Sequence, residues 1–260
     1  MSEDMERDRT MESAVGRREA LYFLGSVMAV GFLSACGSHD DASPTSSSPT
    51  TSTSGATGST NAQCVVTPAL TEGPYFVDER LNRSDLRSDP ATGEVKAGVL
   101  LTLGIALSQI SAAGACSPLA GALVDLWHCD ALGVYSDVQD MGFNTRGQRF
   151  LRGYQITDAS GLARFTTIYP GWYSGRAVHV HVKARTAPGS SSGLEFTSQM
   201  FFDEALTDVV HAQAPYNGKG RRNTTLTTDG IYRSGGSSLL VPLSASGGGY
   251  AGTLNVGVRV

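Results

Sequence analysis

An all-β fold, a single β-sandwich of mostly antiparallel strands, is predicted by this sequence. Short runs rich in β-branched and aromatic residues recur along it, and turn signals rich in Gly, Pro, Asp and Ser separate them. Only 17% of residues are charged and 31 of the 260 are glycine, which suits strands and turns better than helices. Helical periodicity is weak and favours one short helix, at 203–212. No internal repeat divides residues 63–260, so we predict a single domain with one sizeable core there.

The predicted strands follow one another at short spacing. They are expected at 99–107, 120–127, 153–157, 162–168, 178–184, 197–202 and 252–260. The four-residue turn signal DASG at 158–161 separates two of them, so 153–157 and 162–168 are expected to pair as a hairpin. The last strand alternates well enough to close the sheet.

The first 36 residues predict an export signal with a lipobox rather than part of the fold. Residues 20–35 are uncharged and largely apolar, a run shorter than the roughly 20 residues that a membrane-spanning helix needs. Arg17 and Arg18 directly precede the run and resemble a twin-arginine signal, although Ala20 stands where Phe is usual. The run ends LSAC, which resembles a bacterial lipobox, so Cys36 is expected to be lipidated. The alternative is a chance cysteine at the end of an apolar run.

Residues 37–62 predict a disordered tether between this lipid and the domain. Ser and Thr dominate the segment, which lacks the apolar surface needed to offset the entropy of ordering. We therefore expect an exported protein, lipid-anchored to the bacterial cell envelope on its periplasmic or cell-surface side. The choice of membrane and of twin-arginine or general secretory route stays open.

The remaining cysteines are Cys64, Cys116 and Cys129, and outside the cytoplasm a disulfide is plausible. Cys116 and Cys129 flank a single predicted strand, which would hold them far apart. Cys64 is therefore expected to pair with one of the other two, and the sequence leaves the choice open. Three free thiols are the alternative.

The net charge of −4 carries no basic excess, so no nucleic-acid partner is expected. The most informative local feature is instead His179-Val180-His181. Alternate side chains of a strand share a face, so both imidazoles would point to one place. By itself such a pair is weak evidence for a metal site, because histidines on a half-buried strand face are commonly structural.

The residues upstream of this pair strengthen the interpretation as a metal site. The Pro170-Gly171 turn signal could fold Tyr173 back toward the histidine face, and Arg176 could place a fixed positive charge there. A second tyrosine, Tyr135, lies further upstream. Two imidazoles and phenolate oxygens suit a hard ion such as ferric iron. The alternative for each tyrosine is core packing with a satisfied hydroxyl.

These residues lie in motifs that resemble the intradiol ring-cleavage dioxygenases, which include protocatechuate 3,4-dioxygenase and catechol 1,2-dioxygenase. Their exported, single-chain relatives are the nearer likeness. The matching segments, in the family's order, are TEGPYF at 71–76, VDLWHCDALGVY at 124–135, FLRGY at 150–154, TIYPGWY at 167–173, RAVHVH at 176–181 and SQMFF at 198–202.

The resemblance implies a non-haem Fe(III) dioxygenase that uses O2 to cleave catechol-type rings between the two hydroxylated carbons, giving muconate-type diacids. The implied metal ligands are Tyr135, Tyr173, His179 and His181. Tyr173 would be the axial phenolate that leaves when substrate binds and then helps accept a catechol proton. Arg176 would stabilise negative charge on the ring. The residues implied to line the substrate pocket are Trp127, Gly73, Pro74, Tyr75 and Gln199.

The chain also departs from the family pattern. Gly175 stands where the protocatechuate enzyme carries an aromatic residue, which implies a more open mouth and bulkier or varied catechols. The helical dimerisation domain of catechol 1,2-dioxygenases has no counterpart, so dimerisation through it is not expected; the oligomeric state and the preferred catechol stay open. Two rival interpretations are a zinc or copper site with a carboxylate ligand and a membrane-tethered β-sandwich binding module without catalytic metal.

Overall fold

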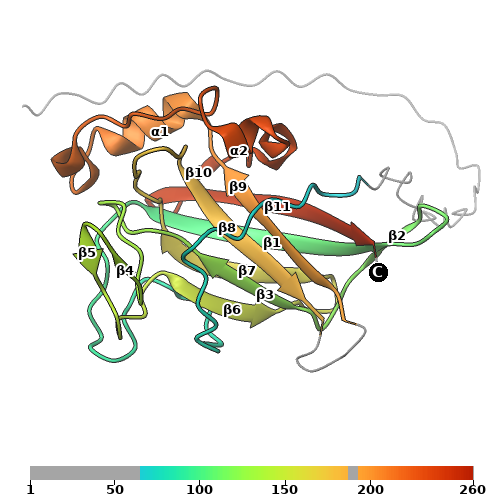
Figure 1. Ribbon diagram of the computed structural model, residues 1–260. Helices are drawn as coiled ribbons and strands as arrows, with labels where there is room; N and C mark the ends of the chain where they lie inside the picture. Colours follow the sequence, from blue (N-terminus) through green and yellow to red (C-terminus); the bar gives the residue numbers. More distant parts are fainter. Residues whose placement is uncertain (1–64, 187–192, 260) are drawn as a thin grey trace, which may run out of the picture. The chain divides into compact units, whose positions relative to one another are not determined.

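The computed structural model describes residues 65–186 and 193–259, and strands dominate this part of the chain (Figure 1). Two main sheets are present. One has the order β10-β11-β1-β2, with β7 also paired to β1; its strands are β1 (Leu100–Ile110), β2 (Cys116–Pro118), β7 (Leu162–Ile168), β10 (Ser244–Ser246) and β11 (Gly249–Arg259). The other has the order β6-β3-β8-β9; its strands are β6 (Arg152–Ile156), β3 (Leu123–Trp127), β8 (His179–Arg185) and β9 (Glu195–Phe201).

The smaller elements lie outside these two sheets. They are the pair β4 (Gln139–Asp140) and β5 (Phe143–Asn144), the helices α1 (Glu204–His211) and α2 (Gly230–Arg233), and the 3-10 turns η1 (Tyr216–Lys219) and η2 (Gly236–Leu239). Helix α1 confirms the helix expected at 203–212, and the Asp203 side chain caps it by accepting a hydrogen bond from the Leu206 N–H. Both α1 and α2 lie beyond the end of β9, at one edge of the strands (Figure 1). The predicted all-β single domain is confirmed.

The hydrophobic core lies between the two main sheets. Leu101, Leu103 and Ile105 of β1 are fully buried in it, as are Val180 and Val182 of β8. Because side chains alternate along a strand, the valines of β8 occupy its inner face and the intervening residues occupy its outer face. That outer face is also covered, since all but the last residue of β8 is buried. A second buried cluster on this side includes Trp127, Cys129 and Tyr135.

The predicted hairpin of 153–157 with 162–168 is wrong. Strand β6 pairs with β3, and β7 pairs with β1 in the other sheet. The turn between them is real: Asp158 Oδ1 accepts hydrogen bonds from the N–H groups of Ser160 (2.9 Å) and Leu162 (3.0 Å). This turn carries the chain from one sheet to the other. A turn signal predicts that the chain changes direction, but it does not predict with which strand the next segment will pair.

The last strand closes its sheet as expected, but in parallel. β11 lies beside β1, with Leu101 opposite Tyr250 and Ile110 opposite Arg259. All other pairings between the named strands are antiparallel. The first and last strands of the domain are therefore neighbours.

Cys116 is disulfide-bonded and Cys129 is a free, buried thiol. A bridge to Cys129 is thereby excluded, and the partner of Cys116 lies outside the described residues, where Cys64 also lies. The predicted export signal at 1–36, its Cys36 and the tether at 37–62 lie outside them as well. In the described ranges, no helix is long and apolar enough to cross a membrane.

Candidate metal centre and active site

Strand β8 holds the two histidines on one face. His179 and His181 alternate with the core valines, so their imidazoles project to the outer side, where both are buried, at 2% and 1% exposure. Their Nε2 atoms lie 3.1 Å apart. His179 Nδ1 lies 2.6 Å from the Ala177 carbonyl oxygen, to which it donates, and this leaves a lone pair on Nε2.

Tyr173 reaches the histidines through the turn at Pro170 and Gly171. The Gly171 N–H donates to the Asp130 carbonyl (3.1 Å), which ties this turn to the preceding loop. Beyond the turn, Tyr173 Oη lies 3.2 Å from His179 Nε2. The half-buried phenol therefore meets the imidazole at the nitrogen that carries the lone pair.

Tyr135 comes from the loop after β3. Asp130 Oδ1 accepts the Val134 N–H (3.0 Å) and holds this loop in a tight turn. The Tyr135 ring is fully buried, with its centroid 5.7 Å from that of Tyr173 and 6.2 Å from that of His181. Its hydroxyl is buried and has no hydrogen-bond partner. A buried phenol without a partner carries a desolvation cost, which a bound cation would offset.

Arg176 places its guanidinium beside the same point. Its Nη1 lies 3.4 Å from His179 Nε2, and its Nη2 donates to Gln199 Oε1. Its Nε donates to Asp229 Oδ2 at 3.0 Å. The structure thus gathers the sequence-predicted residues Tyr135, Tyr173, Arg176, His179, His181 and Gln199 at one place.

Burial keeps the four candidate ligands uncharged in the absence of a cation. It lowers the pKa of His179 to about 3, with a further contribution from the Arg176 charge, and it lowers the pKa of His181 well below its usual value. Burial raises the pKa of Tyr173 to about 12, although Arg176 opposes the shift, and raises the pKa of Tyr135 well above its usual value. Phenolates would form here only with a compensating positive charge.

These residues fit a hard metal ion. Tyr173, Arg176 and His181 all approach His179 Nε2, whose single lone pair cannot accept from every one of them. A cation accepting two imidazole and two phenolate donors would use the convergent lone pairs and the unpartnered Tyr135 hydroxyl together. Within residues 65–186 and 193–259, no three His, Cys, Asp or Glu side chains gather as in a zinc or copper site with a carboxylate.

The segment at 73–75 forms one wall of the site. Gly73 has φ +71°, and a Cβ there would lie 3.4 Å from His181 Cε1, so the backbone passes close to the imidazole. Pro74 is exposed on this turn. The Tyr75 ring stacks on Tyr135 with centroids 4.5 Å apart, and its hydroxyl donates to Asp140 on β4.

The sheet register supplies the other predicted pocket residues. Trp127 on β3 and Gln199 on β9 stand opposite His181, one on each side. The Trp127 ring lies against the His181 ring. Gln199 Nε2 donates to the Thr71 carbonyl (2.8 Å), which fixes the amide so that its oxygen faces Arg176.

Two charged residues of the site went unrecognised in the sequence. Asp229 is one of them. The other is Arg152, 2% exposed, whose Nε donates to Ser136 Oγ (2.7 Å) and whose Nη1 donates to the Tyr75 carbonyl (3.3 Å). Arg152 thereby joins the loop of Tyr135 to the wall of the pocket. Its position inside the FLRGY segment was the available signal; Asp229 lies in a stretch without a recognised motif.

Comparisons with known proteins agree with this site. A family model described as "Dioxygenase" (Dioxygenase_C) matches residues 71–209, which contain the four candidate ligands. An intradiol ring-cleavage dioxygenase from Tetranychus urticae is similar in structure, with TM-score 0.66 and 30% sequence identity over 75% of this chain and 95% of that one. The chain belongs to the intradiol ring-cleavage dioxygenase family.

This intradiol dioxygenase is also similar to other solved structures. The dioxygenase domain of a carbohydrate-binding fusion protein from Streptomyces sp. SirexAA-E matches with TM-score 0.50 and 30% identity, over 75% of this chain and 99% of that one. A 3-chlorocatechol 1,2-dioxygenase from Rhodococcus opacus 1CP shares the fold, with TM-score 0.52 and 19% identity over 74% of this chain and 72% of that one. No curated protein sequence matches the chain.

Proposed function

We propose that this domain is a non-haem Fe(III) enzyme that cleaves catechol-type rings between their two hydroxylated carbons with O2 and forms muconate-type diacids. Family membership supports the reaction class. The observation that carries the proposal for this chain is the convergence of Tyr135, Tyr173, His179 and His181, with an unpartnered buried hydroxyl on Tyr135. Such a donor set suits ferric iron.

The residues have separate tasks in this proposal. Tyr135, Tyr173, His179 and His181 would hold the ion. When bound, ferric iron would supply the positive charge that favours a doubly deprotonated catechol and the electron acceptor that opens its ring to O2.

Tyr173 is the phenol placed to exchange a proton with substrate. Tyr173 is only half-buried, whereas Tyr135 is fully buried, so Tyr173 is the more accessible of the two phenols. Its oxygen would accept a catechol proton, because burial raises the pKa of Tyr173 to about 12.

Arg176 supplies a fixed positive charge at the site. Its guanidinium lies 3.4 Å from the His179 Nε2 atom and is 15% exposed, so the charge is only weakly screened by water. Trp127 and Tyr75 cover the ligands with aromatic surface and keep water from them. The weakly screened charge of Arg176 would favour negative charge on a bound ring.

Gly175 leaves the mouth of the site without a side chain at this position. Gly175 has φ +86°, and a Cβ built on it would meet nothing within 4 Å. The implied aromatic residue of the protocatechuate enzyme is thus replaced by open space. We propose that this enzyme accepts catechols with bulky ring substituents, and turnover of unsubstituted catechol alone would contradict this.

The visible spectrum tests the proposed function. The iron-loaded protein is expected to show a broad tyrosinate-to-iron band that moves to longer wavelength when catechol is added without oxygen. Tyr135→Phe should weaken and shift the band, because a phenolate donor is lost. Tyr169→Phe is the matched control, since Tyr169 is a buried tyrosine that pairs with Thr207 in the main core. A colourless protein that holds no iron after reconstitution would instead favour a binding module without catalytic metal.

We also propose that the enzyme is exported and lipid-anchored to the bacterial cell envelope through Cys36. The apolar run at 20–35, the lipobox and the Ser/Thr-rich segment at 37–62 occur in the order that such a protein needs. All of these residues precede the domain. The proposed substrates are then catechols encountered outside the cytoplasm.

A further inference from the structure

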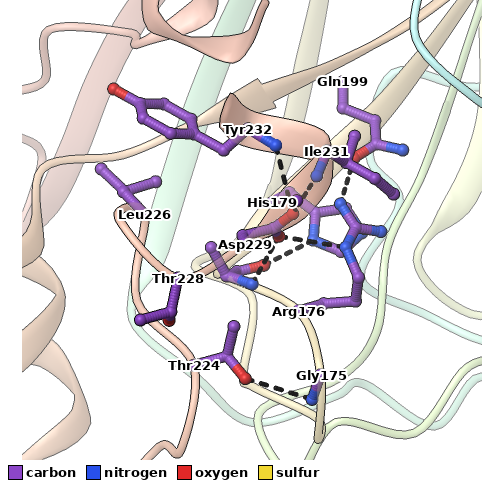
Figure 2. Close-up of polar contacts among 12 residues, drawn as sticks. Gly175, Arg176, His179, Gln199, Thr224, Leu226, Thr228, Asp229, Ile231 and Tyr232 are labelled. Atoms are coloured by element: carbon purple, nitrogen blue, oxygen red, sulfur yellow. Dashed lines mark hydrogen bonds and ion pairs between the residues drawn. The ribbon is translucent and has the colours of Figure 1, made fainter. Parts of the chain in front are cut away.

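Asp229 is a buried carboxylate beside the site, in the chain beyond the end of the family match at residue 209. Its side chain has 0% exposure. Oδ1 accepts the N–H groups of Ile231 (2.7 Å) and Tyr232 (3.1 Å), which fixes the plane of the carboxylate. Oδ2 accepts the Ala177 N–H at 2.8 Å. It also accepts the Arg176 Nε–H at 3.0 Å (Figure 2).

The same segment contacts the arginine turn at a second point. The Gly175 N–H donates to Thr224 Oγ1 at 3.2 Å, so Thr224 and Asp229 hold the backbone on both sides of Arg176 (Figure 2). Hydrogen bonds at two of its nitrogen atoms orient the Arg176 side chain. Its Nε is engaged by Asp229 and its Nη2 by Gln199, which leaves Nη1 directed at His179 Nε2.

We propose that Asp229 is the positioning residue of this enzyme for Arg176: it orients the guanidinium so that one N–H edge faces the point where the ligands converge. This rests on the proposed function of the site. The side-chain hydrogen bonds of Asp229 go to Arg176 and to the backbone N–H groups of residues 177, 231 and 232, and none goes to a candidate ligand, so we infer that it acts through Arg176.

The geometry of a guanidinium explains why an aspartate suits this task. The five N–H donors lie in one rigid plane, so fixing Nε and one Nη fixes the remaining Nη. Without Asp229 the arginine would keep only the Gln199 contact and could rotate about its long side chain. A charged group best stabilises the charge that develops in a reaction when the group is already oriented before the reaction begins.

Metal-free protein provides the first test, independent of iron and of turnover. The Arg176 Nε–H resonance, assigned by its loss in Arg176→Lys, should exchange slowly with water because it is bonded to a buried carboxylate. Asp229→Asn should broaden or abolish it. Asp89→Asn is the matched control, since Asp89 is also buried and accepts backbone N–H bonds, including that of Arg149 (2.6 Å), away from the site. Retention of the resonance in Asp229→Asn would overturn the proposal.

Kinetics of the iron enzyme give the second test. Asp229→Asn is expected to lower kcat about 10- to 100-fold with a change in the KM for catechol of no more than about threefold, as for loss of an oriented charge. Arg176→Met should lower kcat further, and adding Asp229→Asn to Arg176→Met should cost nothing more. Equal losses in both backgrounds would show a general structural effect and refute the positioning role. Asp89→Asn should leave kcat unchanged.

Arg176→Lys covers the case in which Asp229→Asn does not fold. Lysine keeps the charge but has no fork that can bind Asp229 and face His179 together. The proposal expects this variant to lose nearly as much kcat as Arg176→Met, whereas wild-type kcat would overturn it. If wild-type protein lacked both colour and turnover, the proposed function would fail, while the exchange measurement would still report on Asp229 and Arg176.

Discussion

Trp127 stacks on His181, with ring centroids 4.7 Å apart and only 8° between the planes. The contact matters because the two candidate histidine ligands are held differently. His179 is oriented by the hydrogen bond from its Nδ1 to the Ala177 carbonyl, whereas His181 Nδ1 is buried with no hydrogen-bond partner. The indole therefore replaces the hydrogen bond that usually orients a metal-binding imidazole.

Removal of the indole should weaken metal binding. Trp127→Leu is expected to lower the affinity for ferric iron by about 10-fold or more, the range seen when groups that orient ligands are lost. The measurement is iron retention during titration with a chelator. Phe165→Leu, a change in the main core away from the site, should reduce stability without changing iron affinity. Equal iron affinity in Trp127→Leu and the wild type would contradict the orienting role of the stack.

Gly171→Ala should disturb both tyrosine loops at once. A Cβ at Gly171 would lie 2.4 Å from the Ala131 carbonyl oxygen, and backbone cannot move aside cheaply. We expect the free energy of unfolding to fall by about 1–3 kcal/mol or more, together with weaker iron binding, because the loops of Tyr135 and Tyr173 meet here. Gly142→Ala is the control, since a Cβ there meets nothing within 4 Å. Denaturant unfolding measures the stability of both variants, and equal stabilities would refute the prediction.

His128 should make the domain less stable in acid. Burial lowers its pKa from 6.5 to about 4; the neutral ring lies 2.8 Å from the Cys129 carbonyl oxygen, to which Nδ1 donates, and 2.7 Å from Thr167 Oγ1. As the pH falls, His128 binds a proton in the unfolded chain before it does so in the folded protein. The stability that the neutral buried ring contributes is therefore fully present above pH 6.5 and is lost as the pH falls toward 4. The loss should reach roughly 3 kcal/mol at pH 4.

The comparison that isolates this residue is between wild type and His128→Gln in metal-free protein. Other buried histidines titrate in both proteins, so their contribution cancels in the difference. The variant should show a shallower decline of unfolding free energy between pH 6.5 and 4. Parallel curves would show that His128 does not contribute.

Cys36→Ser should release the protein from the membrane. Without the thiol no acyl chain can be attached, so radioactive palmitate should label the wild type and not the variant, and the variant should move to the soluble fraction. Cys129→Ala should keep the label, because Cys129 is a buried thiol inside the domain. Unchanged labelling in Cys36→Ser would refute the proposed anchor.

Local patterns in the sequence were sufficient for much of the fold. The alternation of Val180 and Val182 with the two histidines placed core and site on opposite faces of one strand. Pairing between distant segments was not available in that way. The wrong hairpin and the parallel pairing of β11 with β1 both depend on which strand a segment meets after a turn.

The residues of the site likewise fall into those that local motifs predicted and those that depend on the fold. Tyr135 and Tyr173 became candidates through motifs, since a single tyrosine carries no signal of metal binding. Asp229 had no such support: it lies 53 positions from Arg176, and its contact arises only when the chain beyond α1 returns to the sheet. Buried carboxylates of this kind become visible only with the fold.

The pairing of β1 with β11 also sets an order for folding during synthesis. Strands β3, β6, β8 and β9 all leave the ribosome before β11, so the sheet that holds both imidazoles can assemble while the other sheet is still missing a central strand. Asp229 emerges between these stages. The nascent enzyme should therefore acquire its histidine face first, its anchored arginine next and its closed sandwich last.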